Sequence, residues 1–198
     1  MSQEIKKDDT EAIIRRTAKK LFFGEGKFNA TTQEIADAAG VNRTLINYYF
    51  RSRDNLFNSV FEEALKKEKE KSEFILNSEM TFKEKLSFFI EDSMNKAMQY
   101  PYLEIYIVTQ MNQGCVYNKP ENYDEIMLKL GDELENEIKI GNVKPISVQQ
   151  FLLNLASLVS FPTCMRPLLK ETMKLDDEAF DNLLKERKEI ILNTLFLN

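Results

Sequence analysis

Side chains that can read DNA bases are concentrated between residues 43 and 53, in the stretch RTLINYYFRSR. An arginine can fork onto guanine, an asparagine pairs with adenine, and a threonine contacts thymine through its methyl group or hydroxyl. Tyrosines and further arginines can hold the phosphates and sugars. The candidates are Arg43, Thr44, Asn47, Tyr48, Tyr49, Arg51 and Arg53. This density of suitable residue types favours a surface that binds double-stranded DNA.

The elements that would position these side chains are two short helices joined by a tight turn, in the stretch TTQEIADAAGVNRTLINYYFRSRDNL. Thr31 and Glu34 have the spacing of a capping box, which predicts the start of the first helix. Gly40 ends that helix, because glycine adopts the left-handed conformation without a steric penalty. Asn42 caps the second helix, of about residues 43–49. This arrangement is that of a helix-turn-helix, whose second helix enters the major groove.

The helix before this pair carries an apolar stripe at Ile14, Ala18, Leu21 and Phe22. The spacing predicts one buried helical face, which would pack on the helix pair and complete a three-helix unit. We expect Ile46 and Phe50 to face inward from the second helix of the pair. Ser52 fits the N-cap of a long helix that follows directly.

Charge is distributed unevenly along this chain of 198 residues, whose net charge is −5. Residues 13–53 hold eight basic and three acidic side chains, a net of +5, so the rest carries −10. A basic segment on an acidic body turns that segment towards phosphates. The charge pattern therefore agrees with DNA binding by the N-terminal part alone.

The segment from about Glu11 to Phe61 resembles the DNA-binding domain of the TetR family of bacterial transcriptional regulators. The matching residues are AKKLFFGEGKFNATT, QEIADAAGVNRTLINYYF and RSRDNLF. The resemblance implies an all-α fold, with an N-terminal three-helix DNA-binding domain and a C-terminal helical domain for ligand binding and dimerisation. It adds Thr32 and Gln33 to the DNA contacts. Many relatives carry an aromatic residue where Asn47 stands, so the family's base preference does not transfer.

We expect two domains, the helix-turn-helix domain at residues 1–55 and the helical domain at residues 56–198. Beyond residue 53 the sequence predicts one helix after another, without the alternation typical of strands. Three further N-caps are expected, at Thr81, Ser147 and Asp176. Pro162 and Pro167 are expected to break the chain after the apolar helix that Ser147 begins.

Two apolar stripes near the C-terminus are the candidate dimer interface. They comprise Phe151, Leu155, Leu158, Phe180, Leu184, Ile191 and Leu195. The alternative is that both stripes are buried within one subunit. A single recognition helix reads only a few base pairs, so such proteins usually dimerise on a palindrome, and the resemblance points to a four-helix interface. We therefore expect a homodimer on a palindromic operator.

The helical domain is rich in Phe, Tyr and Met, which ordinarily fill a core. The resemblance implies a pocket here for a small-molecule effector. The candidate ligand-binding residues are Phe89, Met98, Tyr102, Tyr106, Gln110, Phe151 and Asn154. Few polar groups lie among them, so we expect a largely apolar effector. Its binding would release the DNA by a population shift, and the family mostly represses, so we expect a repressor.

The chain contains no histidine, which excludes Ser-His-Asp triads, Cys-His dyads and His-rich zinc sites. We expect no enzyme, no metal site and no cofactor. Cys115 and Cys164 are expected to be buried free thiols, with a redox sensor as the alternative. The N-terminus is polar and no run of about 18 apolar residues occurs, so we expect a cytoplasmic protein with neither signal peptide nor membrane span.

Two other classes compete with a DNA-reading regulator. One is a helical adaptor whose basic face binds an acidic partner without reading DNA. The other is a DNA-acting enzyme, which would need clustered metal-binding carboxylates that the sequence does not show. Loss of operator binding on charge reversal of Arg43, with the fold intact, separates the regulator from the adaptor.

Overall fold

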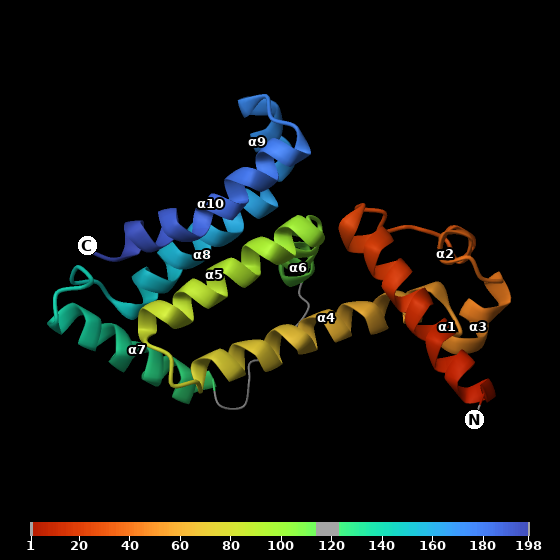
Figure 1. Cartoon of the computed structure of the whole chain (residues 1–198), viewed down its shortest axis with the longest axis horizontal. Helices are drawn as coiled ribbons and strands as arrows, with labels where there is room; N and C mark the ends of the chain where they lie inside the picture. Colours follow the sequence, from red (N-terminus) through yellow and green to blue (C-terminus); the bar gives the residue numbers. More distant parts are fainter. Residues whose placement is uncertain (1, 114–122, 198) are drawn as a thin grey trace. The chain divides into compact units, whose positions relative to one another are not determined.

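The computed structural model describes residues 2–113 and 123–197, and every regular element in those ranges is a helix (Figure 1). The predicted all-α fold is confirmed. The chain forms two compact units, Met1–Glu68 and Lys69–Asn198. The boundary between them falls inside one long helix, α4 (Arg53–Leu76).

The N-terminal unit is built on an aromatic core. Its first helix, α1 (Ser2–Lys19), continues into a short π-helix, η1 (Lys20–Gly24). All four residues of the predicted apolar stripe are buried, at no more than 7% exposure. The rings of Phe22 and Phe23 pack on Phe57 of α4, with centroids 4.7 and 5.7 Å away. This cluster fixes the end of the first helix against the start of α4.

The helix pair α2 (Thr32–Ala39) and α3 (Arg43–Phe50) follows the predicted capping chemistry. Both hydrogen bonds of the capping box at Thr31 are present. Gly40 takes a φ of 66°, the left-handed conformation that favours glycine. The Asn42 side chain accepts a backbone amide at the start of α3. Short-range chemistry therefore sets the ends of both helices.

The C-terminal unit continues from α4 into a layered helical bundle. Its helices are α5 (Phe82–Gln99), α6 (Leu103–Asn112), α7 (Tyr123–Lys139), α8 (Val148–Cys164), α9 (Arg166–Met173) and α10 (Asp177–Leu195). α5, α8 and α10 pack side by side, and α9 packs on α8 and α10 (Figure 1). The three expected N-caps, Thr81, Ser147 and Asp176, are all present.

Pro162 does not break the chain, contrary to the sequence-based expectation, because α8 continues through it to Cys164. A proline lacks the N–H that would serve the carbonyl four residues earlier, here that of Leu158. The Arg187 guanidinium of α10 donates to this carbonyl instead, with an Nη2–O distance of 2.9 Å. Pro167 lies in the first turn of α9, a position that tolerates proline.

Within the described ranges, no single helix has the length and apolarity of a membrane span. α8 and α9 together have the required length and apolarity, but the chain bends by 72° between the two helices.

Candidate nucleic-acid interface and C-terminal surfaces

The α2–α3 pair has a buried face and a polar exposed face. Ile35 and Ala36 of α2, with Ile46 and Phe50 of α3, are at most 6% exposed and hold the pair on the core. Six predicted DNA contacts are exposed: Gln33, Arg43, Thr44, Asn47, Tyr48 and Arg51. Three others are partly buried: Thr32, Tyr49 and Arg53.

A hydrogen bond across the turn joins two of these candidates. The Arg43 Nε donates to the Thr32 hydroxyl at 3.0 Å, which links the start of α3 to the start of α2. The bond uses Nε, so the forked pair of terminal nitrogens remains the donor set suited to a guanine edge. The structure thus orients an arginine that sequence alone could only place on a helix.

Neighbouring contacts define what the other candidates offer. The Thr44 hydroxyl donates to the Asn42 side-chain oxygen at 2.7 Å, so its proton is used in the cap and its methyl group is left for a thymine. The Tyr48 and Tyr49 rings meet edge to face, with centroids 5.1 Å apart. Tyr48 is 56% exposed, and its phenol therefore has access to a sugar-phosphate backbone.

Acidic residues of the basic segment are engaged in local interactions. Hydrogen bonds from the Thr31 backbone amide and hydroxyl lower the pKa of Glu34. A hydrogen bond from Lys27 lowers the pKa of Glu25, and the two charges lie 2.8 Å apart. Asp37 on α2 accepts from the Gln33 amide at 2.7 Å. These three carboxylates therefore stabilise local structure, and the eight basic residues of segment 13–53 outnumber them.

Arg51 and Arg53, both predicted phosphate ligands, have different environments. Arg51 is exposed and takes a φ of 68°, a conformation that L-residues rarely adopt. Arg53 packs against a pair of aromatic rings, its guanidinium carbon 5.3 Å from the Phe22 centroid and 5.0 Å from that of Phe57. A capped helix pair with this buried inner face and polar outer face defines a DNA-binding helix-turn-helix.

Comparison with known proteins agrees with this class. Residues 14–60 match the family model of the bacterial regulatory proteins of the tetR family. Residues 14–60 therefore carry the N-terminal domain of that family, and the resemblance predicted from the sequence is confirmed for this segment. A comparison with curated protein sequences gives no match.

Solved structures share the fold over nearly the whole chain. A putative fatty acid metabolism regulator of Clostridium perfringens is 19% identical, covering 94% of this chain and 100% of its own, with a TM-score of 0.56. A TetR family regulator of Marinobacter aquaeolei VT8 is 13% identical, covers 100% of both chains and has the same TM-score of 0.56. Bacillus subtilis FadR, solved with stearoyl-CoA, is 20% identical over 93% of this chain and 98% of its own, at 0.54.

The predicted dimer residues lie mostly inside the C-terminal unit. Five of the seven are buried at 6% exposure or less, namely Phe151, Leu155, Phe180, Leu184 and Ile191. Leu158 and Leu195 are partly buried. These stripes fill the core between α5, α8 and α10, as the alternative interpretation allowed. Three of the seven, Leu158, Phe180 and Leu184, also line a groove on the other face of α8 and α10, which is the surface left for a partner.

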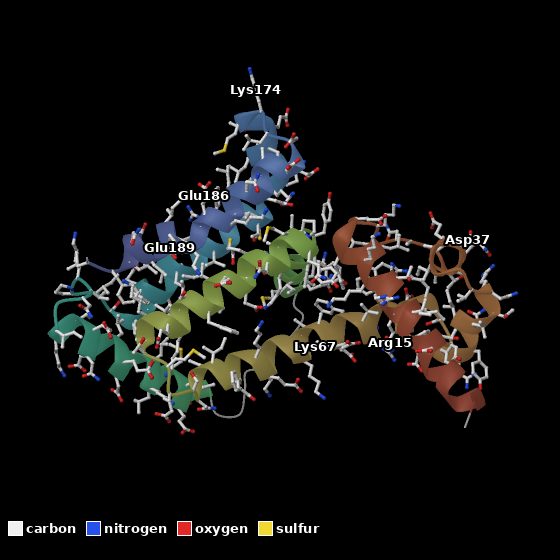
Figure 2. All side chains as sticks on the ribbon, viewed as in Figure 1. Arg15, Asp37, Lys67, Lys174, Glu186 and Glu189 are labelled. Atoms are coloured by element: carbon white, nitrogen blue, oxygen red, sulfur yellow. The ribbon has the colours of Figure 1, made fainter. Side chains whose placement is uncertain are left out.

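That other face is apolar and forms a groove between α8, α9 and α10 of about 440 Å³. Exposed apolar side chains line it: Phe161, Met173, Leu183 and Ile190. Arg187 lies among them, and its buried Nε has no hydrogen-bond partner in the described part of the chain. Glu186 and Glu189 lie on the outer side of α10 (Figure 2). Sequence reasoning missed this stripe, although Leu183, Arg187 and Ile190 have helical spacing.

The predicted ligand residues are spread over α5, α6 and α8. Phe151 is a core residue at 1% exposure, with its ring 5.6 Å from Phe82. Met98 lines a small pocket of about 180 Å³ between α5 and α10. Phe89 and Tyr102 are more than one-third exposed, and so are neighbouring apolar residues of α5 and α6. The neighbours are Phe88, Ile105, Val108 and Met111.

The remaining predictions concern cysteine and metal chemistry. Burial raises the pKa of the Cys164 thiol, and the Glu104 charge raises it further, so the thiol is held in its protonated form. Cys115 lies outside the described residues. Among those residues, no group of three or more Cys, Asp and Glu side chains gathers as a metal site.

Proposed function

We propose that the chain is a ligand-responsive regulator that binds a palindromic operator as a homodimer in the cytoplasm and represses transcription. The observation that carries the proposal is the exposed set Arg43, Thr44 and Asn47 on a capped α3 helix, in a segment that matches the tetR-family domain. Their donors and methyl group suit the edges of guanine, thymine and adenine. The predicted contacts on α2 and α3, together with Arg51 directly after α3, form the proposed DNA surface.

The groove on α8 and α10 supports the homodimer. Phe161 and Ile190, at 56% and 47% exposure, belong to an apolar surface that an isolated chain would leave in water. In a twofold dimer the same surface meets itself, so both copies bury it at once. A second copy also supplies the second recognition helix that a palindrome requires.

The exposed apolar residues of α5 and α6 support a small, largely apolar effector. Beside them, the Lys71 ammonium lies 5.2 Å from the Phe88 centroid and pairs with Asp92. Burial raises the pKa of Asp92, but hydrogen bonds from Lys71 and Lys96 outweigh it and leave the pKa lowered. An apolar surface with one charged cluster suits an amphiphilic molecule. The similar structure of FadR holds stearoyl-CoA, an amphiphile.

The proposed mechanism is a population shift. The effector binds better to a conformer of the dimer in which the recognition helices do not fit successive major grooves. Operator binding and effector binding then weaken each other by the same factor, because the coupling is reciprocal.

Fluorescence anisotropy with the DNA that flanks the chain's own gene tests DNA reading. The wild type should bind this DNA and not a scrambled sequence, with affinity falling as salt rises. Arg43→Glu should abolish specific binding, whereas Lys144→Glu, an exposed residue of the other unit with the same change in charge, should retain it. Binding to neither DNA at low salt would overturn the proposal and favour an adaptor.

A compound screen tests the effector. Apolar and amphiphilic compounds are added to the operator complex, and release is followed by the fall in anisotropy. A true effector also raises the thermal midpoint of the free protein, because it binds the folded state. A broad screen in which no compound weakens operator binding would remove the ligand switch and leave a constitutive DNA-binding protein.

A further inference from the structure

We propose that Arg53 and Arg15 are positioning residues that hold the reading helices, and that Arg51 makes the phosphate contact expected of Arg53. This inference rests on the proposed DNA binding and deepens it. Arg51 would contact the DNA, whereas Arg15 and Arg53 would stabilise the positions of α2 and α3 without contacting it.

Most of the Arg53 guanidinium is already occupied by contacts within the N-terminal unit. Nε donates to the Ala30 carbonyl at 3.3 Å, and Nη1 bonds to the Asp54 carboxylate at 3.0 Å. Nη2 is buried and has no partner in the ranges that the structure describes. The guanidinium also packs against the ring pair of Phe22 and Phe57, whose centroids lie 5.3 and 5.0 Å from its central carbon. A phosphate oxygen cannot reach a buried nitrogen, and at Nη1 it would have to displace a carboxylate.

These contacts fix the beginning of α2. Ala30 directly precedes the capping box of α2, so the bond from Arg53 ties that start to the start of α4. The aromatic contacts tie the same arginine to η1 and α4. A guanidinium group is planar and always charged, so it can pack on aromatic rings and donate several hydrogen bonds at once. A lysine ammonium would reproduce neither the ring packing nor this set of hydrogen bonds.

Arg15 braces the end of α3 in a similar way. Its guanidinium carbon lies 4.9 Å from the centroid of Phe50, the last residue of α3. Nη1 donates to the Ser59 hydroxyl of α4 at 3.0 Å, and Nη2 pairs with Glu11 at 2.7 Å. Figure 2 shows Arg15 on α1 beside the start of α4. Arg15 and Arg53 together hold both ends of the helix-turn-helix.

Arg51 has the opposite properties. It is exposed, and in the described part of the chain its side chain makes no hydrogen bond or ion pair. It directly follows the recognition helix, at a φ of 68° that glycine would adopt without strain. Strained residues of this kind persist at functional sites. Glycine would fit this backbone conformation better than arginine. The presence of Arg51 is therefore explained by its positive charge, which a phosphate contact requires.

The experiment compares specific and scrambled DNA over a series of salt concentrations, at a temperature where every variant is folded. Losing one phosphate contact weakens binding to all sequences uniformly and lowers the slope of log affinity against log salt by about 1. Losing a positioning residue weakens specific binding and leaves the salt slope unchanged. Lys144→Met, in the other unit, controls for the removal of one charge.

Arg51→Gly should lower the salt slope by about 1 and weaken both DNAs alike. Arg53→Met and Arg15→Met should weaken specific binding by about tenfold, with the salt slope and scrambled-DNA binding unchanged. A slope that falls by about 1 in Arg53→Met, with uniform weakening, would overturn the proposal.

Arg53→Lys keeps the positive charge, so it distinguishes a positioning role from a phosphate contact if Arg53→Met does not fold. A positioning role predicts that Arg53→Lys still loses specific binding, whereas wild-type binding by this variant would overturn the proposal. If the wild type binds no DNA, the proposed function fails, and amide exchange decides this inference separately. Arg53→Lys should then speed exchange at the start of α2 while Arg51→Gly should not, and unchanged exchange would overturn it.

Discussion

The two units of the chain treat large apolar side chains differently. Among the described residues of Met1–Glu68, the exposed ones are Ile13, Tyr48 and Leu65. Lys69–Asn198 is less than twice as long, and its described residues include sixteen exposed ones. The N-terminal unit buries Phe22, Phe23, Phe50 and Phe57, so most of its large apolar side chains are covered without a partner. The C-terminal unit leaves surfaces that a second copy and an effector would cover.

Introducing a charge into the α8–α10 groove should have the largest effect on assembly. Ile190→Glu would bury one carboxylate from each copy in the proposed interface, so the dissociation constant of the dimer should rise at least about hundredfold. Sedimentation velocity measures it. Ile140→Glu is the control, since Ile140 is 68% exposed and does not line the groove. An unchanged dimer in Ile190→Glu would place the interface elsewhere.

Truncating an aromatic side chain should destabilise the N-terminal unit more than the C-terminal unit. Phe22→Ala removes a fully buried ring and should destabilise the N-terminal unit by about 3–5 kcal/mol. Phe88→Ala removes a ring that is 38% exposed and should cost less than about 1 kcal/mol. Hydrogen exchange along the chain in urea assigns each loss to its unit. Equal losses would contradict the comparison.

The bond between Arg187 and the Leu158 carbonyl can be tested in a double-mutant cycle. Arg187→Met leaves that partly buried carbonyl unpaired and should cost about 1–3 kcal/mol. In a Pro162→Ala background the helix regains its own N–H donor, so the same change should cost less. Urea unfolding at fixed protein concentration gives both values. Equal costs in the two backgrounds would show that Arg187 does not replace the missing donor.

The two capping boxes offer a matched pair, one in each unit. Thr31→Ala and Thr81→Ala each remove a side chain that accepts a helix amide, so each should destabilise its unit by about 1 kcal/mol. The double variant should lose the sum, because the two sites share no partner. A loss confined to Thr31→Ala would mean that tertiary packing, rather than the cap, fixes the start of α5.

Changing the pH between 6 and 8 should have the smallest effect. The chain has no histidine, so no side chain with an ordinary pKa titrates there. Backbone hydrogen bonds lower the pKa of Glu34 and Glu84, so their stabilisation is complete above the unfolded pKa of about 4.3. It is lost as pH falls through the lowered folded values. Thermal midpoints should be flat at neutral pH and fall below about pH 4, and a slope near pH 7 would contradict this.

The sequence predicted the helix ends well because capping is short-range chemistry. Thr31, Gly40 and Asn42 act on atoms at most a few residues away. The fate of Pro162 depended instead on Arg187, whose donated bond spans 29 residues. No local pattern contains that contact, so the break expected at Pro162 was wrong.

The two candidate sites also differ in how well the sequence predicts them. The polar face of α3 could be predicted, since a buried Ile46 and Phe50 leave a single outer face. α8 and α10 are apolar on two faces, and helical spacing cannot tell a core from an interface in that case. Phe151 and Ile191 were therefore candidates for the interface, with burial inside one subunit as the alternative, and both are buried, whereas the exposed Ile190 was missed. The different environments of Arg51 and Arg53 depend on aromatic packing that spacing does not encode.

The aromatic core of the N-terminal unit closes within the first third of the chain, and this orders events during synthesis. Ribosomes add about 5–20 residues per second, so the remaining residues follow over several seconds. The reading unit can fold while the body is still being made. α10, which carries much of the proposed interface, is synthesised after every other described helix. Each copy would therefore display a finished reading surface before it can pair, and the concentration of released chains would set when an operator can first be occupied.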